Sequence, residues 1–375
     1  MTVRTYRSTD AGASALTINN TAGKLIAVLD AALVNGYSVG TVSSITRVGT
    51  TATVTMSAAH GLADFGNMVT IAGCDQADYN GEFPITITGP DTFTFQVAND
   101  PVTPATGAIT AAKAGSGWTK PYSDTNKAAY QQGSGSNGFY LYVDDTGTTA
   151  ARAVGYETMS SITDTTGNAF PTEVQYSGGL YLPKSNGSTD REWIIVATES
   201  DIYFWINVTG TITSSALSFF GDFISEKNGD AFATVFIACT SANPISGNGV
   251  ASTTPSITAA MVGHFIARTA AQTGTSVTAG KHINHVAAKA ASYAGSNGLP
   301  YPTMNGVLKY CLIYIHESVI ADVRGQLPGV LAPLHNRPLT HLDCFVGTGD
   351  YAGKIYVVLD CYLNGQVFIE ISNTR

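Results

Sequence analysis

Charged side chains are scarce in this sequence. Asp, Glu, Lys and Arg make up 12% of its 375 residues, about half the usual share of about 25%. The net charge is −8. Nucleic-acid binding needs clustered Lys and Arg, so we expect no nucleic-acid partner. Disorder is excluded as well, because it requires low hydrophobicity and 44% of the residues are hydrophobic. Because the surface carries so little charge, identical copies of the protein repel one another only weakly. This property suits a subunit that packs against neighbours.

Long hydrophobic runs are also missing. The longest, Trp193–Ala197 and 312–315, have the length of strands, and a membrane helix needs about 20 apolar residues. Residues 1–10 contain no apolar stretch, so the sequence predicts no secretory signal. We therefore expect a soluble protein that is made in a reducing cytoplasm and has no membrane partner.

The five cysteines, at positions 74, 239, 311, 344 and 361, form no CxxC pair. The simplest interpretation is five buried small hydrophobic side chains. Alternatively, Cys344 and Cys361 face each other on neighbouring strands and could be oxidised later. An odd count leaves at least one thiol over in either case.

The clearest helix is expected at residues 21–34. Thr21 can serve as its N-cap, and Asn35-Gly36 is a stop signal. Apolar residues at 25, 26, 29 and 33 build one face. Residues 257–267 and 282–291 are weaker helix candidates, so little helix is predicted elsewhere.

Residues 41–112 are predicted to form a separate β-module. Alternating segments at 41–48 and 51–56 flank Gly49-Thr50 like a hairpin. Further short strands are expected at 68–71, 83–88 and 92–97. This number of strands indicates a small antiparallel sandwich, Ig-like, or a small barrel.

The turn-like flanks of this module, 35–40 and 113–122, could join directly into one loop. Since loop tips tolerate insertions, we interpret the module as inserted into a main β-rich domain of residues 1–40 plus 113–375. That domain is one antiparallel sandwich or barrel, or two subdomains that divide near 210–255.

Most of the main domain is predicted to be strand. Expected strands lie at 139–143, 193–198, 202–208, 231–239, 308–315, 354–359 and 366–371, and residues 155–160 form a strand or short helix. Residues 241–260 and 270–281 are rich in Ser, Thr, Gly and Ala and predict loops or an arm. The segment 325–339 contains three prolines and is expected to be irregular, lying against its own sheet or another subunit.

Four short motifs suggest ligand chemistry, and each has a plainer interpretation. Residues 133–138 match GxGxxG but precede a strand, whereas a dinucleotide site must open a helix. His282 and His285, with His264, could supply three zinc ligands, but nothing in the sequence brings His264 to the pair. Asp144-Asp145 and Asp75 with Asp78 offer too few carboxylates for calcium. We therefore predict no cofactor and no metal.

Catalysis requires paired carboxylates or a nucleophile with a base. His316-Glu317 and His341 with Asp343 are the nearest candidates, and the sequence gives neither a partner. We therefore predict no catalytic residues and a protein that is not an enzyme.

Aromatic residues crowd one region of the chain. They are Tyr181, Trp193, Tyr203, Phe204, Trp205, Phe219, Phe220 and Phe223. A sandwich core explains them, and an exposed carbohydrate-binding platform is the alternative. Alternation directs Tyr203 and Trp205 to one face of a strand and Phe204 to the other, so one set is less buried or meets another layer.

Several segments resemble a family of virion structural proteins of tailed bacteriophages. They are 6–12 (YRSTDAG), 23–37 (GKLIAVLDAALVNGY), 117–122 (GWTKPY), 126–130 (NKAAY), 154–159 (VGYETM) and 331–339 (LAPLHNRPL). The inserted module is similar to a small β-module of many phage surface and tail proteins, through 59–62 (AHGL), 69–73 (VTIAG), 79–81 (YNG) and 91–95 (DTFTF).

The resemblance implies a virion component assembled in the bacterial host cytoplasm, and it supplies no catalytic residues. We expect a homo-oligomer at the neck or collar of the head–tail junction, in contact with other virion proteins, with the module projecting outward. Capsid decoration is the second expectation. A tail or baseplate protein that binds host-surface glycans is the third. In each case the outward-facing inserted module is the part available to bind such glycans.

Overall fold

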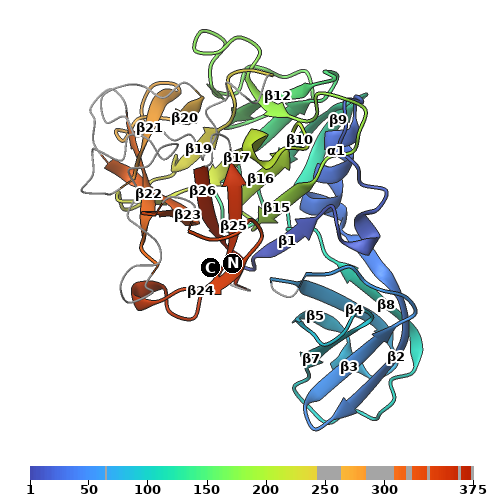
Figure 1. The fold of residues 1–375 in the computed structure, drawn as a ribbon. Coiled ribbons are helices and arrows are strands. Elements are labelled where there is room, and N and C mark those ends of the chain that lie inside the picture. Colours follow the sequence, from blue (N-terminus) through green and yellow to red (C-terminus); the bar gives the residue numbers. More distant parts are fainter. Residues whose placement is uncertain are drawn as a thin grey trace.

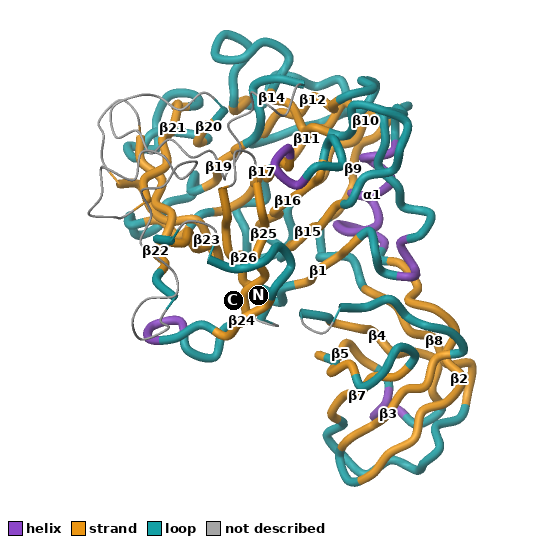
Figure 2. Tube along the Cα trace, viewed as in Figure 1, coloured by secondary structure: helices purple, strands orange, loops and turns teal. Residues whose placement is uncertain are grey.

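The computed structural model describes residues 1–63, 66–242, 263–283, 308–317, 323–335, 338–361 and 365–372. Its strands form three antiparallel sheets, accompanied by one short α-helix and a few single helical turns in the described ranges. The predicted mainly β class is therefore confirmed (Figures 1 and 2).

The largest sheet has thirteen strands and curls into a nearly closed barrel. Its order is β1-β15-β16-β17-β19-β20-β21-β22-β23-β26-β25-β24, and β18 pairs with β23. The bounds are β1 (Arg4–Arg7), β15 (Trp193–Ala197), β16 (Asp201–Asn207), β17 (Ser215–Asp222), β18 (Ile224–Ser225), β19 (Thr234–Ile237), β20 (His264–Ile266), β21 (Val277–Ile283), β22 (Tyr310–Glu317), β23 (Val323–Pro333), β24 (Cys344–Val346), β25 (Ile355–Cys361) and β26 (Gly365–Glu370). The strands on both sides of residues 210–255 thus belong to one sheet.

Strand β16 is buried on both faces because it separates two hydrophobic cores. Tyr203 and Trp205 pack into the core inside the barrel, whereas Phe204 packs into the core shared with the second sheet. Apart from half-buried Tyr181, every member of the aromatic cluster is at most 4% exposed. The core interpretation of the cluster is confirmed, and a carbohydrate platform at these positions is wrong because a second layer covers them.

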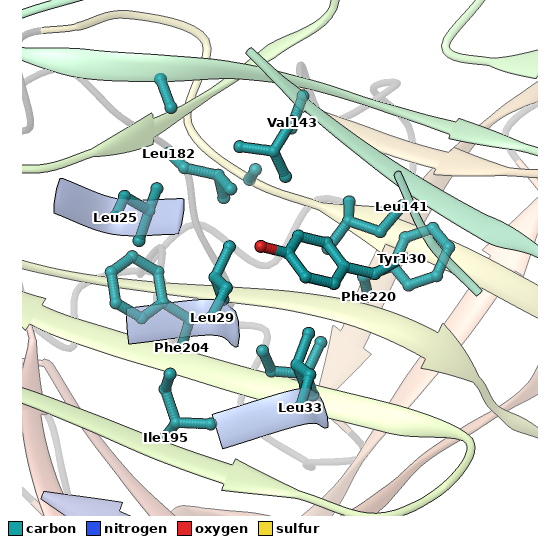
Figure 3. Close-up of a cluster of buried hydrophobic side chains, with 14 of the residues drawn as sticks. Leu25, Leu29, Leu33, Tyr130, Leu141, Val143, Leu182, Ile195, Phe204 and Phe220 are labelled. Carbon is teal, nitrogen blue, oxygen red and sulfur yellow. The ribbon is translucent and has the colours of Figure 1, made fainter. Parts of the chain in front are cut away.

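The second sheet has six strands in the order β13-β12-β11-β10-β9, with β14 also paired to β12. They are β9 (Thr119–Asp124), β10 (Lys127–Gln131), β11 (Tyr140–Asp144), β12 (Ala150–Tyr156), β13 (Ala169–Phe170) and β14 (Leu180–Pro183). Its inner face packs with helix α1 (Lys24–Leu29) against the large sheet. Figure 3 shows this core, with Leu25 and Leu29 from the helix, Leu141 and Val143 from β11, and Phe204 and Phe220 from the large sheet.

The N-terminal helix is shorter than predicted and begins differently. Helix α1 continues as the π-helix η2 (Asp30–Asn35) and ends at Gly36, where the stop signal lies. Its N-cap is Gly23, so the expectation of Thr21 is wrong. A distant carboxylate takes over the capping, because Asp145 Oδ2 accepts hydrogen bonds from the backbone N–H groups of Leu25 and Ile26, at 2.8 and 3.3 Å.

The segment expected to be irregular at 325–339 is mostly the long strand β23. Pro328 is tolerated within this strand because the pairing with β22 shifts register there: Leu312 faces Leu331 and Tyr314 faces Gln326. Pro328 lies within this bulge, where a backbone donor is dispensable. Its carbonyl accepts a hydrogen bond of 2.8 Å from the Tyr203 hydroxyl.

The inserted module is a seven-stranded sheet with its own core, and it extends away from the main body (Figure 1). The order is β5-β4-β8-β2-β3-β7-β6. The strands are β2 (Tyr37–Val48), β3 (Thr51–Met56), β4 (Met68–Cys74), β5 (Gly81–Pro84), β6 (Thr86–Ile87), β7 (Thr92–Gln96) and β8 (Gly107–Lys113).

Other strand predictions have mixed outcomes. The hairpins at 41–48 with 51–56 and at 193–198 with 202–208 are confirmed. The strand expected at 231–239 is only Thr234–Ile237. The helix expected at 257–267 is wrong where the chain is described, since β20 occupies it. The helix expected at 282–291 is wrong at its described start, which belongs to β21. Residues 243–262 and 284–291 lie outside the described residues.

The cysteines support the first of the two interpretations. None of the five is in a disulfide, and each is buried or half-buried. Register pairs Cys344 with Val357 and Cys361 with Gly365, so these two thiols do not face each other. The predicted pair is wrong because Cys361 lies four residues beyond the partner of Cys344.

Candidate binding groove on the six-stranded sheet

The Gly-rich loop at 133–138 leads into strand β11, and no helix follows it. Its backbone is held by an acid from the large sheet, since Asn137 N donates to Asp222 Oδ2 at 2.8 Å. Asp222 also accepts from Gln132 and Thr234. The loop is therefore a structural connection between the two sheets, and it lacks the helix N-terminus that a phosphate site requires.

The candidate calcium ligands all have structural partners. Asp144 pairs with Lys127, and Asp145 pairs with Lys184 at 2.6 Å while capping helix α1. Asp75 accepts from Thr106, and Asp78 accepts from Asn99. Among the described residues, no group of three His, Cys, Asp or Glu side chains is placed to hold a metal ion.

The candidate zinc and catalytic histidines are scattered. His264 is buried in β20, while His285 and the side chain of His282 lie outside the described residues. His341 packs its ring 4.7 Å from that of Trp205. His341 Nδ1 also accepts a hydrogen bond of 3.1 Å from Asp360 N, so this histidine has a structural role in the fold.

Glu317 and Asp343 are likewise engaged in the fold. Glu317 pairs with Arg324, which also binds Asp230 at 2.8 Å in a buried network. The Asp343 carboxylate accepts from Thr340 N at 2.9 Å. The structure thus engages the carboxylates of both candidate pairs in hydrogen bonds or ion pairs within the fold.

A different surface has the features of a binding site, namely the outer face of the six-stranded sheet. Alternation along β11 directs Leu141 and Val143 to the core and leaves Tyr140, Tyr142 and Asp144 half-buried on this face. Tyr142 meets Tyr156 of β12 edge to face, with ring centroids 6.4 Å apart. Two adjoining hollows lie here, of about 510 and 500 Å³.

Both hollows share a floor and a wall. Val154, Tyr156, Thr165 and Glu173 line the two of them, so they form one continuous groove. Residues 162–165, Glu173 and Gly178 contribute to the lining of the first hollow. The second hollow continues toward Asn168 and Pro171.

Charges of alternating sign cross one end of the groove. The cross-strand register aligns Asp124 of β9, Lys127 of β10, Asp144 of β11 and Arg152 of β12 in one row. Lys127 Nζ lies 3.0 Å from Asp144 Oδ2. Such opposite-sign neighbours stabilise antiparallel pairs.

The Tyr181 ring completes this row on β14. The guanidinium carbon of Arg152 lies 3.9 Å from its centroid, within the range of a cation–π contact. Arg152 Nε also donates to the carbonyl of Gly178 at 2.9 Å. The charged row thereby fixes both the sheet face and the loop that borders the groove.

Hydrogen bonds from the loops to two carboxylates hold the walls in place. Asp164 accepts from the backbone and hydroxyl groups of both Thr166 and Ser160, which lowers the pKa of this carboxyl. Glu173 accepts from Ser177 and Gly178, with the same effect on its pKa. Each carboxylate closes its own loop.

The pKa of Asp144 is also below its ordinary value. Desolvation opposes this shift, but the hydrogen bonds from Thr146 and Lys127 outweigh it. Burial raises the pKa of the Tyr142 and Tyr156 phenols. At neutral pH the groove therefore presents neutral aromatic rings beside ionised carboxylates.

Sequence reasoning missed this groove, although part of its signal was visible. The alternation of Tyr140, Tyr142 and Asp144 with apolar residues indicates one polar, aromatic face of a strand. Alignment with Tyr156 and Arg152 depends on cross-strand register, and the walls come from loops at 157–168 and 171–179. Neither can be read from a single segment.

Neither a comparison with protein-family models nor a search of curated proteins finds a match to this chain. In the part of the chain that the structure describes, no helix has the length and apolar character needed to cross a membrane.

Proposed function

We propose that this chain is a non-enzymatic structural subunit of a tailed-bacteriophage particle. In this proposal it assembles as a homo-oligomer at the neck or collar, and its inserted module projects outward. The resemblance of the segments at 6–12, 23–37 and 331–339 suggests the class of particle. The observation that carries the proposal is the way in which the module is mounted on the body.

Both ends of the module are fixed at one point. Asp10 Oδ2 accepts from the Tyr37 hydroxyl at 2.6 Å and from Lys113 Nζ at 2.7 Å. Tyr37 and Lys113 are cross-strand partners at the start of β2 and the end of β8. The carboxylate and the ammonium are both almost fully buried, so this anchor is shielded from water.

A second contact fixes the angle of the module. Arg4 of β1 forms a two-pronged pair with Glu82 of β5, with both N–O distances 2.7 Å. Such fork-like pairs are directional as well as strong. A module with two separate anchors is held as a rigid projection, which suits an outward-facing part of a particle surface.

The large sheet offers an edge for lateral assembly. Strand β24 is the last strand of its sheet and pairs with β25 on one side. Val346 on this strand is 59% exposed. Exposed edges with apolar side chains are natural templates for pairing with another chain, and the low charge of the sequence leaves such pairing unopposed.

The location can be tested on purified particles. Particles from a host that produces this chain are banded by density, and their proteins are identified by mass spectrometry. Antibodies against residues 41–112 are then located by immunogold electron microscopy, with preimmune serum as the control. We expect label around the neck, and absence of the chain from banded particles would contradict the proposal.

Two alternatives give different labelling. Label over the whole capsid would indicate a decoration protein, and label at the tail tip would indicate an adhesion protein that binds host-surface glycans. The adhesion alternative is favoured by one observation, the aromatic groove on the six-stranded sheet.

A further inference from the structure

We propose that the groove on the outer face of the six-stranded sheet binds an uncharged saccharide. The inference stands independently of whether the chain is a particle subunit, and it places saccharide binding on the main domain instead of the inserted module. It rests on the size of the groove, its aromatic floor, its unused hydrogen-bonding groups and its charge.

The groove has the size of a ligand site. Each hollow has a volume of about 500 Å³, within the range of about 300–1,000 Å³ typical of small-molecule sites. Because the hollows adjoin along Tyr156 and Glu173, the groove is elongated. An elongated groove suits a short chain of sugar rings better than a single compact ligand.

The floor offers aromatic rings to the apolar faces of sugars. Tyr142 and Tyr156 line the first hollow, and Tyr156 also lines the second. The C–H face of a pyranose packs on such a ring, which contributes a large contact area at little entropic cost. The T-shaped contact between the two rings fixes their orientation before a ligand arrives.

Tyr156 also supplies an unused polar group. The residue is only 7% exposed, and its hydroxyl has no protein partner among the described residues. The residue borders both hollows, where its hydroxyl is available to a ligand. A ligand hydroxyl in the groove would satisfy it.

The carboxylates differ in what they can still accept. A carboxylate offers about four acceptor positions, and Asp164 uses four within its own loop. Glu173 uses two, for Ser177 and Gly178. Asp124, at the other end of the groove, accepts from Thr125 N. Glu173 and Asp124 therefore remain able to accept hydrogen bonds from sugar hydroxyls.

The net charge of the groove selects the kind of saccharide. Four carboxylates and two cations line the first hollow, a net charge of −2. The cations are engaged, Lys127 by Asp144 and Arg152 by carbonyls and Tyr181. A uronic or sialic acid would meet repulsion here without a free cation to bind it, whereas a neutral sugar would not.

The same groups favour binding over cleavage. Glycoside hydrolysis needs a carboxyl with a raised pKa as the general acid. Hydrogen bonds hold the pKa of Asp164 and Glu173 below ordinary values, and that of Asp144 is lowered as well. These three groups are ionised at neutral pH and cannot act as the acid.

Binding can be measured on the full chain by NMR saturation transfer and isothermal titration. The probes are maltohexaose, cellohexaose and chitohexaose, with hexagalacturonate as the charged comparator. We expect at least one neutral probe to bind at millimolar concentration or better. Failure of all three, or tighter binding of hexagalacturonate, overturns the proposal.

Variants test whether the groove is the site. Tyr142→Ala should weaken binding at least tenfold, and Tyr156→Phe, which keeps the ring, about five- to tenfold. Tyr122→Ala is the matched control, because Tyr122 lies on the same face, stacked on Tyr140, but does not line the groove. Unchanged binding in the first two variants, or an equal loss in the control, overturns the assignment.

One further variant guards against misfolding. If Tyr142→Ala does not fold by circular dichroism, Asp124→Asn replaces it, because the side chain of Asp124 is at the surface and Asn can still accept from Thr125 N. We expect Asp124→Asn to weaken binding of the neutral probe about threefold and to reduce its discrimination against hexagalacturonate. Unchanged affinity and unchanged discrimination overturn the proposal.

Discussion

The carboxylate of Asp145 accepts a hydrogen bond of 2.8 Å from the backbone N–H of Leu25, 120 residues earlier in the chain. The same carboxylate lies 2.6 Å from Lys184 Nζ, and both side chains are fully buried. One acid therefore joins the N-terminal helix, the end of β11 and the residue that follows β14.

Replacing Asp145 by Asn should destabilise the main domain strongly. The amide oxygen can still cap the helix, but the ammonium of Lys184 is left as an uncompensated buried charge. Breaking a buried pair in this way costs about 3–5 kcal/mol, and the measurement is the free energy of unfolding in urea. Lys127→Ala, which removes a partly exposed pair with Asp144, should change it by no more than about 1 kcal/mol. Equal effects of the two variants would contradict this prediction.

Asp10→Asn should loosen the mounting of the inserted module. It weakens the bonds to Tyr37 and Lys113 and leaves a buried ammonium. We expect faster hydrogen exchange at both ends of the module, at 37–38 and 113–114, and a broader range of module positions in small-angle scattering. Asp100→Asn at the exposed ion pair with Arg47 should leave both readings as in the wild type. Unaltered exchange in Asp10→Asn would show that the anchor lies elsewhere.

Gly155→Ala should strain the packing between β12 and β13. A methyl group there would lie 2.4 Å from the ring of Phe170, and Phe170 is fully buried in the core. Overpacking of this kind costs about 1–3 kcal/mol, to be read from the thermal midpoint. Gly187→Ala is the control, since its nearest contact would be Arg191 at 3.9 Å. If Gly187→Ala lowers the thermal midpoint as well, the loss of stability comes from removing a glycine in general and not from the contact with Phe170.

The loop at 160–166 should open in acid. The pKa of Asp164 is lower in the folded protein, so its hydrogen bonds stabilise the loop fully above the unfolded value of about 3.9 and are lost as pH falls through the lower folded pKa. The amide NMR signals of Ser160 and Thr166 should therefore shift with a midpoint well below about pH 3.9. The same titration of Asp164→Asn should show no such shift. If the shift persists in this variant, another titrating group causes it.

Cys311 should react slowly with iodoacetamide in the native protein. Burial raises the pKa of its thiol to about 12, three units above an ordinary thiol, so the reactive thiolate is about a thousandfold rarer at pH 8. Mass spectrometry of tryptic peptides before and after unfolding in urea gives the ratio of rates. Similar rates in the two states would contradict the predicted shift.

Much of the fold was predictable because it depends on local pattern. The hairpins around Gly49-Thr50 and between β15 and β16 follow from alternation and turn residues. The burial of Tyr203 and Trp205 on one face of β16 and of Phe204 on the other also follows from alternation, if a second layer covers the sheet. In each case neighbouring residues in the sequence carry the information.

The predictions that were wrong share a physical cause, because each feature depends on residues that are distant in the sequence. Asp145, and not Thr21, caps the helix, and the sheet around Pro328 makes a strand where prolines suggested a loop. The groove arises because register places Tyr142 beside Tyr156 and aligns Asp144 with Arg152. Register depends on the whole sheet, so a reading confined to short segments does not find it.

The paired ends of the inserted module also determine how it transmits force. β2 enters and β8 leaves at the same place, where Tyr37 faces Lys113 and both bind Asp10. A pull on the distal turn at Gly49 would therefore pass to this anchor, where Lys113 Nζ also donates to the Thr5 carbonyl of β1, and to the pair of Arg4 with Glu82. Tension on the module would reach the large sheet at β1, the strand at one end of its order, and not at the strands in its middle.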